Sequence, residues 1–171
     1  MKGDDVMTNS ISELISVLSG KRSTMEELLH LLEEEQRCIV ELDLPNLEAQ
    51  MEKKKRLLVD LETSNNLCRQ LVKQAAVELD LPEVASLSPL LPKVASSQRD
   101  ILKGLQTRLL ELGTALDRLL AFNGELLQGS LRTVTRSLEF FGNMFNRSKT
   151  YGEAGCMVKG TNDVRLICKE I

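Results

Sequence analysis

The strongest constraint on the fold is a set of apolar residues that recur every seven positions along most of the chain. In the first third these residues are Ile11, Leu18, Met25, Leu32 and Ile39. This spacing places one apolar stripe along an α-helix, and such a stripe is normally covered by another helix. The series therefore predicts a helix at about residues 10–42 that packs along its length against other helices.

The start and continuity of this first helix can be read from a few residues. Ser10 and Glu13 have the spacing of a capping box, which predicts that the helix starts at Ser10. Gly20 lies inside the helix, where glycine costs about 1 kcal/mol. Because the seven-residue phase survives Gly20, we expect a continuous or mildly kinked helix. A second apolar series on this helix is interrupted by Lys21 and Glu35.

A second helix is predicted at about residues 44–80, because Pro45 suits the first helical turn. Polar residues, Lys54 among them, interrupt its apolar positions. The basic run from Lys53 to Arg56 is interpreted as a solvated helix face rather than a nucleic-acid site, which would need more charge and nearby aromatic residues. The main apolar series consists of Leu44, Met51, Leu58, Val72 and Leu79.

Residues 81–92 hold three of the four prolines and predict a connector with room for one short helical turn. A third helix is expected at about residues 93–145. Its apolar series steps by one residue after Leu126, as a 3.6-residue repeat does against a 3.5-residue seam. This helix is longer than its partners, so part of its apolar face should stay open for another helix or for a second copy of the chain.

Together these patterns predict an all-α protein: three long antiparallel amphipathic helices that form an elongated helical hairpin or bundle over residues 1–145. Aromatic residues make up 3% of the 171 residues and tryptophan is absent, which is typical of long-helix proteins. Residues 146–171 lose the periodicity and are rich in glycine, which predicts a flexible C-terminal tail. The tail contains Tyr151, the only tyrosine in the chain.

Several classes of function are not expected. One histidine and four widely spaced cysteines offer no metal site, and no phosphate-binding loop or catalytic triad can be assembled, so we expect no enzyme activity, metal or cofactor. A net charge of −3 does not favour nucleic acid. The absence of a long apolar run and of a signal-peptide pattern predicts a cytoplasmic protein with no direct membrane insertion.

Two C-terminal stretches resemble a known family. The sequence reads NGELLQGSLRTVTRSLEFF from Asn123 and TYGEAG from Thr150. Both are similar to motifs of the FlgN family, the bacterial chaperones of flagellar type III export. The acidic and basic stretch LLEEEQRCIVELDLPNLEAQMEKKKRLLVDLE is similar too, although it is generic amphipathic helix. The chain departs from the strict tail pattern at Thr150, which directly precedes Tyr151.

The resemblance implies a cytosolic chaperone that binds the C-terminal segments of the hook–filament junction proteins FlgK and FlgL. It would prevent their premature aggregation or polymerisation and deliver them to the export gate protein FlhA. Tyr151 is the candidate gate-binding residue. The candidate client-binding residues are Leu119, Asn123, Leu126, Leu127, Leu131, Val134, Leu138 and Phe141.

Alternatives stay open at this stage. The chain could be a coiled-coil adaptor or structural subunit with no export role. Asn123 could fix helix register as a buried polar residue, and Tyr151 could fold back onto the bundle. The sequence does not decide between monomer and homodimer, the preference between FlgK and FlgL, or whether the helices rearrange on client binding.

Overall fold

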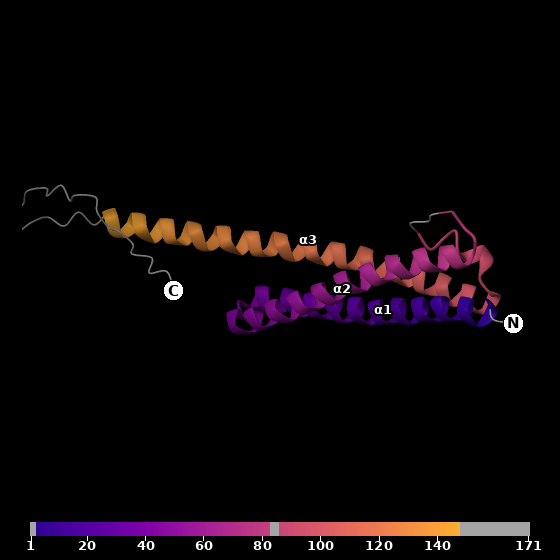
Figure 1. Cartoon of the computed structure of the whole chain (residues 1–171). Coiled ribbons are helices and arrows are strands. Elements are labelled where there is room, and N and C mark those ends of the chain that lie inside the picture. Colours follow the sequence, from indigo (N-terminus) through magenta and orange to yellow (C-terminus); the bar gives the residue numbers. More distant parts are fainter. Residues whose placement is uncertain (1–2, 83–85, 148–171) are drawn as a thin grey trace, which may run out of the picture. The chain divides into compact units, whose positions relative to one another are not determined.

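The computed structural model describes residues 3–82 and 86–147, and these residues form three long helices with no strand (Figure 1). This confirms the all-α prediction. A short 3₁₀ helix in the connector precedes the last long helix. The elements are α1 (Gly3–Glu41), α2 (Leu44–Glu78), η1 (Leu91–Lys93) and α3 (Ser96–Arg147).

Helix α1 begins earlier than the capping box predicts. It starts at Gly3, so Ser10 lies inside the helix and does not cap it. The Ser10 hydroxyl instead donates a hydrogen bond to Glu78 Oε1 on α2, at 2.5 Å. The helix runs through Gly20 without a break, as the surviving seven-residue phase predicts.

The turn between α1 and α2 is very short, because the same residues end the first helix and cap the second. Leu42 adopts a left-handed backbone conformation with φ of 58°. The N–H of Asp43 then donates back to the carbonyl of Cys38 at 2.9 Å, which closes α1 with a Schellman motif. Asp43 also caps α2, since its Oδ1 accepts a hydrogen bond from the N–H of Asn46 at 3.3 Å. Pro45 lies in the first turn of α2.

The end of α2 repeats this motif with the same six residues, VELDLP, at 40–45 and 77–82. At the second copy Asp80 takes the left-handed conformation, with φ of 51°, and the N–H of Leu81 donates to the carbonyl of Ala76 at 2.9 Å. At the first copy the left-handed residue is Leu42, because Asp43 is needed as the cap of α2. Aspartate tolerates this conformation better than leucine does. Apolar periodicity does not reveal this repeat.

The chain divides into two compact units, Met1–Leu127 and Gln128–Ile171. The first unit holds two apolar clusters. In one, early residues of α1 meet late residues of α2 and early residues of α3; in the other, later residues of α1 meet an earlier residue of α2 and later residues of α3. The helices of this unit therefore run up, down and up. One cluster consists of Ile11, Leu14, Leu18, Leu71, Val72, Ala75, Ala76, Leu90, Leu91, Val94, Leu102 and Leu105. The other consists of Met25, Leu28, Leu31, Leu32, Leu57, Leu112 and Leu116.

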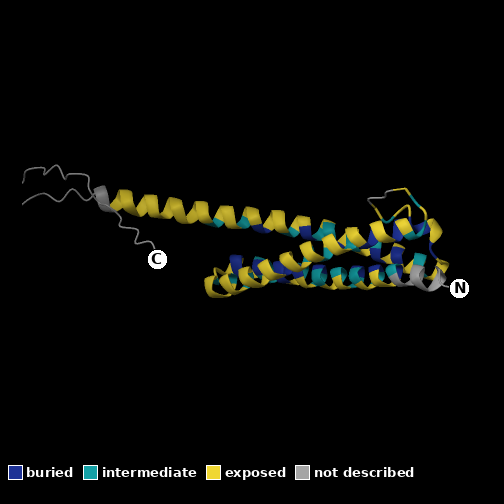
Figure 2. Cartoon of the chain, viewed as in Figure 1, coloured by how far each residue is buried: buried dark blue, intermediate teal, exposed yellow. Residues whose placement is uncertain are grey.

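The described part of the second unit is the last stretch of α3, from Gln128 to Arg147. Its residues are exposed from 128 to 144, apart from the half-buried Ser130 (Figure 2). The apolar periodicity of α3 thus continues beyond the point where its side chains are covered. Phe145 and the predicted tail from Ser148 onward have side chains outside the described residues.

Candidate helix-binding site

The open face of α3 carries five of the eight candidate client-binding residues. We call them the α3 stripe: Leu127, Leu131, Val134, Leu138 and Phe141. Their spacing of four, three, four and three residues places them on one side of the helix. Their exposed fractions lie between 41% and 68%. A stripe of this length and exposure is a surface that another amphipathic helix can cover.

The other three candidates are turned toward the bundle. Leu119 is half-buried and packs against the cluster around Leu112. Leu126 is also half-buried, and Asn123 is only 2% exposed. The sequence reasoning placed all eight on one open face, whereas the structure divides them at Leu127.

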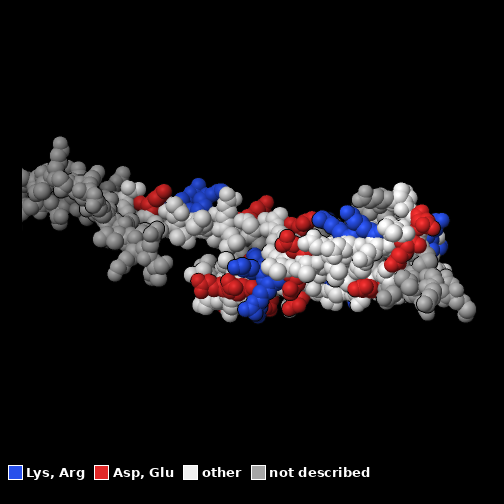
Figure 3. All heavy atoms as spheres, viewed as in Figure 1, with Lys and Arg blue, Asp and Glu red and all other residues white. Residues whose placement is uncertain are grey.

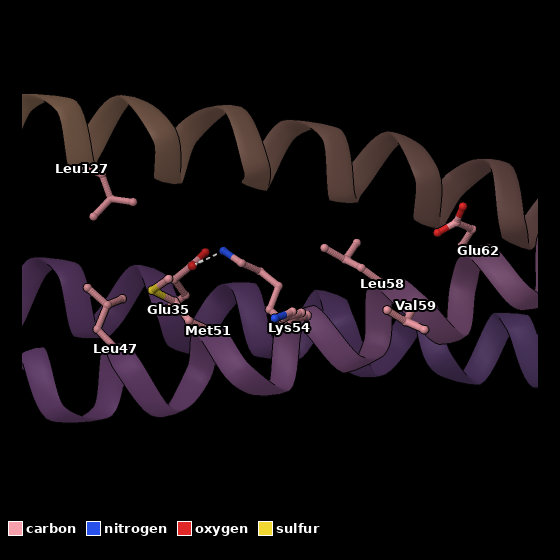
Figure 4. Close-up of a pocket in the computed structure, with 9 residues that line it drawn as sticks. Glu35, Leu47, Met51, Lys54, Leu58, Val59, Glu62 and Leu127 are labelled. Carbon is pink, nitrogen blue, oxygen red and sulfur yellow. Dashed lines mark hydrogen bonds and ion pairs between the residues drawn. The ribbon is translucent and has the colours of Figure 1, made fainter.

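Asn123 takes part in a buried polar cluster with Glu35 and Lys54. Its Nδ2 donates to the carbonyl of Leu32 and to Glu35 Oε2, both at 2.9 Å. Glu35, 2% exposed, also forms an ion pair with the Lys54 ammonium (Figure 4). These contacts match the alternative in which Asn123 fixes helix register. Both hydrogens of the Asn123 amide nitrogen are therefore donated to partners inside the bundle.

The hydroxyl groups beside the α3 stripe donate their hydrogen bonds within α3 itself. Thr133, Thr135 and Ser137 each donate to the carbonyl four residues earlier, at 3.0, 2.9 and 3.0 Å. The charged residues Arg132 and Arg136 project from the opposite side of the helix by the same periodicity. The stripe is therefore flanked by uncharged groups, and its contacts with a partner depend on apolar packing.

Metal chemistry has no support in the described part of the chain, where no group of His, Cys, Asp or Glu side chains could hold an ion. His30 lies on the surface, 3.7 Å from Glu33. Cys38 is buried, and burial raises the pKa of the half-buried Cys68 thiol, opposed by the nearby charge of Lys21. The raised pKa makes the Cys68 thiol a poor nucleophile and a poor metal ligand at neutral pH.

The charged side chains of the described residues form no broad field of one sign on the face that Figure 3 shows. On the face in Figure 3, acidic and basic groups are interspersed over the first unit. The basic run of α2 is partly neutralised there, because Lys54 pairs with Glu35. None of the described helices is long and apolar enough to span a bilayer.

Comparison with known proteins gives one match. No curated protein and no solved structure matches the chain. The model of the FlgN protein family matches residues 7–159, which cover all three helices and reach into the segment that contains Tyr151. The chain therefore belongs to the FlgN protein family.

Proposed function

We propose that this flagellar export chaperone binds the C-terminal segments of FlgK and FlgL through the α3 stripe. It covers these segments in the cytosol, prevents their premature aggregation or polymerisation, and delivers them to the export gate. The observation that carries the proposal is the long apolar face of α3, whose five stripe residues are exposed. A helical client segment fits such a face with residues spaced three and four apart.

The energetics of the stripe suit a chaperone that must later release its client. Burying a leucine side chain fully contributes about 1.5–3 kcal/mol. The stripe residues are already partly covered by their own helix, so each adds less than this range. Ordering a disordered client segment offsets a further part of the gain. The resulting affinity is moderate, and no buried charge holds the client in place.

The proposal extends to the C-terminal segment. The segment after α3 docks on FlhA with Tyr151 as an anchor, because a tyrosine offers a large apolar ring and a hydroxyl at low entropic cost. Tyr151 lies outside the described residues. The role of this segment follows from the family resemblance of the TYGEAG stretch.

A titration with client peptides tests the α3 stripe. Peptides of the last ~40 residues of FlgK and of FlgL are titrated into the full chain and into Leu131→Asp and Leu138→Asp. Each substitution removes the apolar burial of one side chain and also places a carboxylate against the apolar client, so we expect each variant to bind at least about tenfold more weakly.

Phe140→Asp is the matched control. Phe140 is 64% exposed and adjoins the stripe in sequence, but it projects from the other side of α3. It should bind both peptides within about threefold of the wild type. Circular dichroism excludes unfolding. Folded stripe variants that bind as tightly as the wild type would place the client elsewhere, and a structural coiled-coil subunit would bind neither peptide.

A further inference from the structure

The first half of α2 leaves open an apolar stripe that the sequence places in a helix seam. Leu44, Met51 and Leu58 are 66%, 58% and 48% exposed, whereas Val72, further along the same series, is buried. A groove of about 450 Å³ runs beside Met51 and Leu58 (Figure 4). Its lining residues are Glu35, Leu47, Met51, Lys54, Lys55, Leu58, Val59, Glu62 and Leu127.

The charged residues along one edge of this stripe alternate in sign. Glu48, Lys55, Glu62 and Arg69 follow each other at intervals of seven residues, and all four are exposed. None of them forms an ion pair with another residue in the described part of the chain. Seven residues are about two helical turns, so the four charges stand in one line along α2.

This order of charges is complementary to itself when two copies of α2 run in opposite directions. With a two-fold axis between Leu58 and Val59, Lys55 of one copy faces Glu62 of the other, and Glu48 faces Arg69. In an antiparallel helix pair, residues at equivalent flanking positions meet in this way and set the orientation. A parallel pair in the same register would instead place the two lines of charges on opposite sides of the interface, so they could not pair with each other.

We propose that two copies of the chain pair through α2, antiparallel, about an axis at Leu58 and Val59. The apolar centre buries the exposed faces of Met51 and Leu58 in both copies. Four intermolecular ion pairs, two of Lys55 with Glu62 and two of Glu48 with Arg69, fix the direction and register. The interface is isologous, so every contact occurs twice. The pairing uses α2, whereas the proposed client binding uses the α3 stripe, of which Leu127 lines the groove beside α2.

A second copy is the favoured occupant because both halves of the charge pattern lie in the sequence itself. Another protein, or this chain's own residues 148–171, would have to supply a matching line of charges. The C-terminal segment VRLICKEI does not contain two opposite charges seven residues apart. In the test below, dimerisation only after removal of residues 148–171 points to this segment, and a chain that stays monomeric leaves the stripe to another protein; both outcomes overturn the proposal.

Sedimentation velocity of the full chain over a concentration series tests the pairing. We expect a concentration-dependent dimer that weakens with added salt, since exposed ion pairs are screened. Leu58→Asp and Lys55→Glu should each raise the dimer dissociation constant about tenfold or more, because each substitution occurs twice in the interface. Leu110→Asp, on an exposed part of α3 away from the groove, should leave the constant within about twofold.

Mixing two single variants gives the sharpest result. Lys55→Glu carries two acids at these positions and Glu62→Lys carries two bases, so each variant repels its own copy. Mixed in equal amounts they are complementary, and we expect a heterodimer of near wild-type stability. The double variant Lys55→Glu/Glu62→Lys should likewise dimerise on its own. Folding defects produce neither form of rescue.

Three results would overturn the proposal. One is a wild-type chain that stays monomeric at concentrations on the order of 100 μM, or that becomes dimeric only when residues 148–171 are removed. Another is a dimer that Leu131→Asp disrupts and Leu58→Asp does not, which would place the contact on the α3 stripe. The third is a failure of the two charge variants to rescue each other. The client titration measures peptide binding to α3, so its outcome can be told apart from these results, which measure pairing through α2.

Discussion

Asn123 on α3 donates a hydrogen bond from Nδ2 to Oε2 of Glu35 on α1 at 2.9 Å, across a sequence separation of 88 residues. Lys54 on α2 pairs with the other oxygen of the same carboxylate. Each of these three residues interrupts an apolar series of its own helix. The three interruptions meet at one level, where the Asn123 amide nitrogen, the Glu35 carboxylate and the Lys54 ammonium are paired. An axial shift of one helix would separate these partners.

The first prediction concerns this polar cluster. Lys54→Met leaves the Glu35 carboxylate buried without its cation, and we expect a loss of about 2–3 kcal/mol in the free energy of unfolding. The Lys54 side chain is 24% exposed, which keeps the loss below that of a fully buried pair. Lys53→Met, at an exposed neighbouring position, should change stability by less than about 0.5 kcal/mol. Urea denaturation measures both.

Replacing the whole cluster separates stability from register. The triple variant Glu35→Leu/Lys54→Met/Asn123→Leu removes all three polar groups together, and we expect it to be at least as stable as the wild type. If Lys54→Met alone proves neutral, water reaches the Glu35 carboxylate and the cluster does not tie the helices together.

The second prediction concerns the turn at Leu42. A leucine in the left-handed region, at φ of 58°, carries a steric cost of about 1 kcal/mol that glycine avoids. Leu42 is also 69% exposed, so little packing is lost on its removal. We expect Leu42→Gly to raise the free energy of unfolding by about 0.5–1 kcal/mol in chemical denaturation.

The matched comparison is Asp80→Gly at the second copy of the motif, where φ is 51°. Aspartate is better tolerated in this conformation, so its replacement should stabilise the protein less than Leu42→Gly does. A destabilised Leu42→Gly variant would show that contacts of the leucine side chain outweigh its backbone strain.

The sequence predicted the helices well because their evidence is repeated many times. A heptad series such as Ile11 to Ile39 contains several independent observations of one period. The survival of its phase through Gly20 predicted a continuous or mildly kinked helix, and α1 is continuous there. The predicted start of α1 was wrong because a capping box consists of only two residues, which can match the pattern by chance. Ser10 fits that pattern but uses its hydroxyl on Glu78 instead.

The site was harder to predict because apolar spacing shows which residues share a face, but not which part of the face is covered. Leu119 and Leu131 belong to the same helix pattern, and only the structure shows that the first packs in the bundle and the second lies open. The basic run of α2 was interpreted as solvated, yet Lys54 turns inward to Glu35. Its partner lies on another helix, so no local pattern could reveal the pair.

The third prediction concerns the reactivity of Cys68. Burial raises the pKa of its thiol, and the charge of Lys21 lowers it by a smaller amount. Only the thiolate reacts with an alkylating reagent, so the rate should rise with pH along a curve displaced to higher pH than that of a free cysteine. Iodoacetamide kinetics on a variant with the other three cysteines replaced by serine measure this curve.

Replacing Lys21 tests the electrostatic part of the pKa shift. Lys21→Met removes a positive charge that stabilises the thiolate, so the curve should move to still higher pH. A curve at the pH of a free cysteine in both proteins would mean that water reaches the Cys68 thiol freely.

The fourth prediction concerns the salt dependence of client binding and rests on the proposed function of the α3 stripe. The residues beside the stripe are uncharged, and the hydroxyls of Thr133, Thr135 and Ser137 are satisfied within the helix. Binding should therefore depend on apolar burial, which added salt does not weaken, and hardly at all on ion pairs. Between 50 mM and 500 mM salt we expect the affinity for a FlgK or FlgL peptide to change less than about threefold, as measured by calorimetry.

Arg136→Glu reverses a charge on the far side of the helix and should leave both the affinity and its salt dependence unchanged. A tenfold loss of affinity at high salt, or a large effect of Arg136→Glu, would mean that the client lies across the charged side of α3 rather than along the stripe.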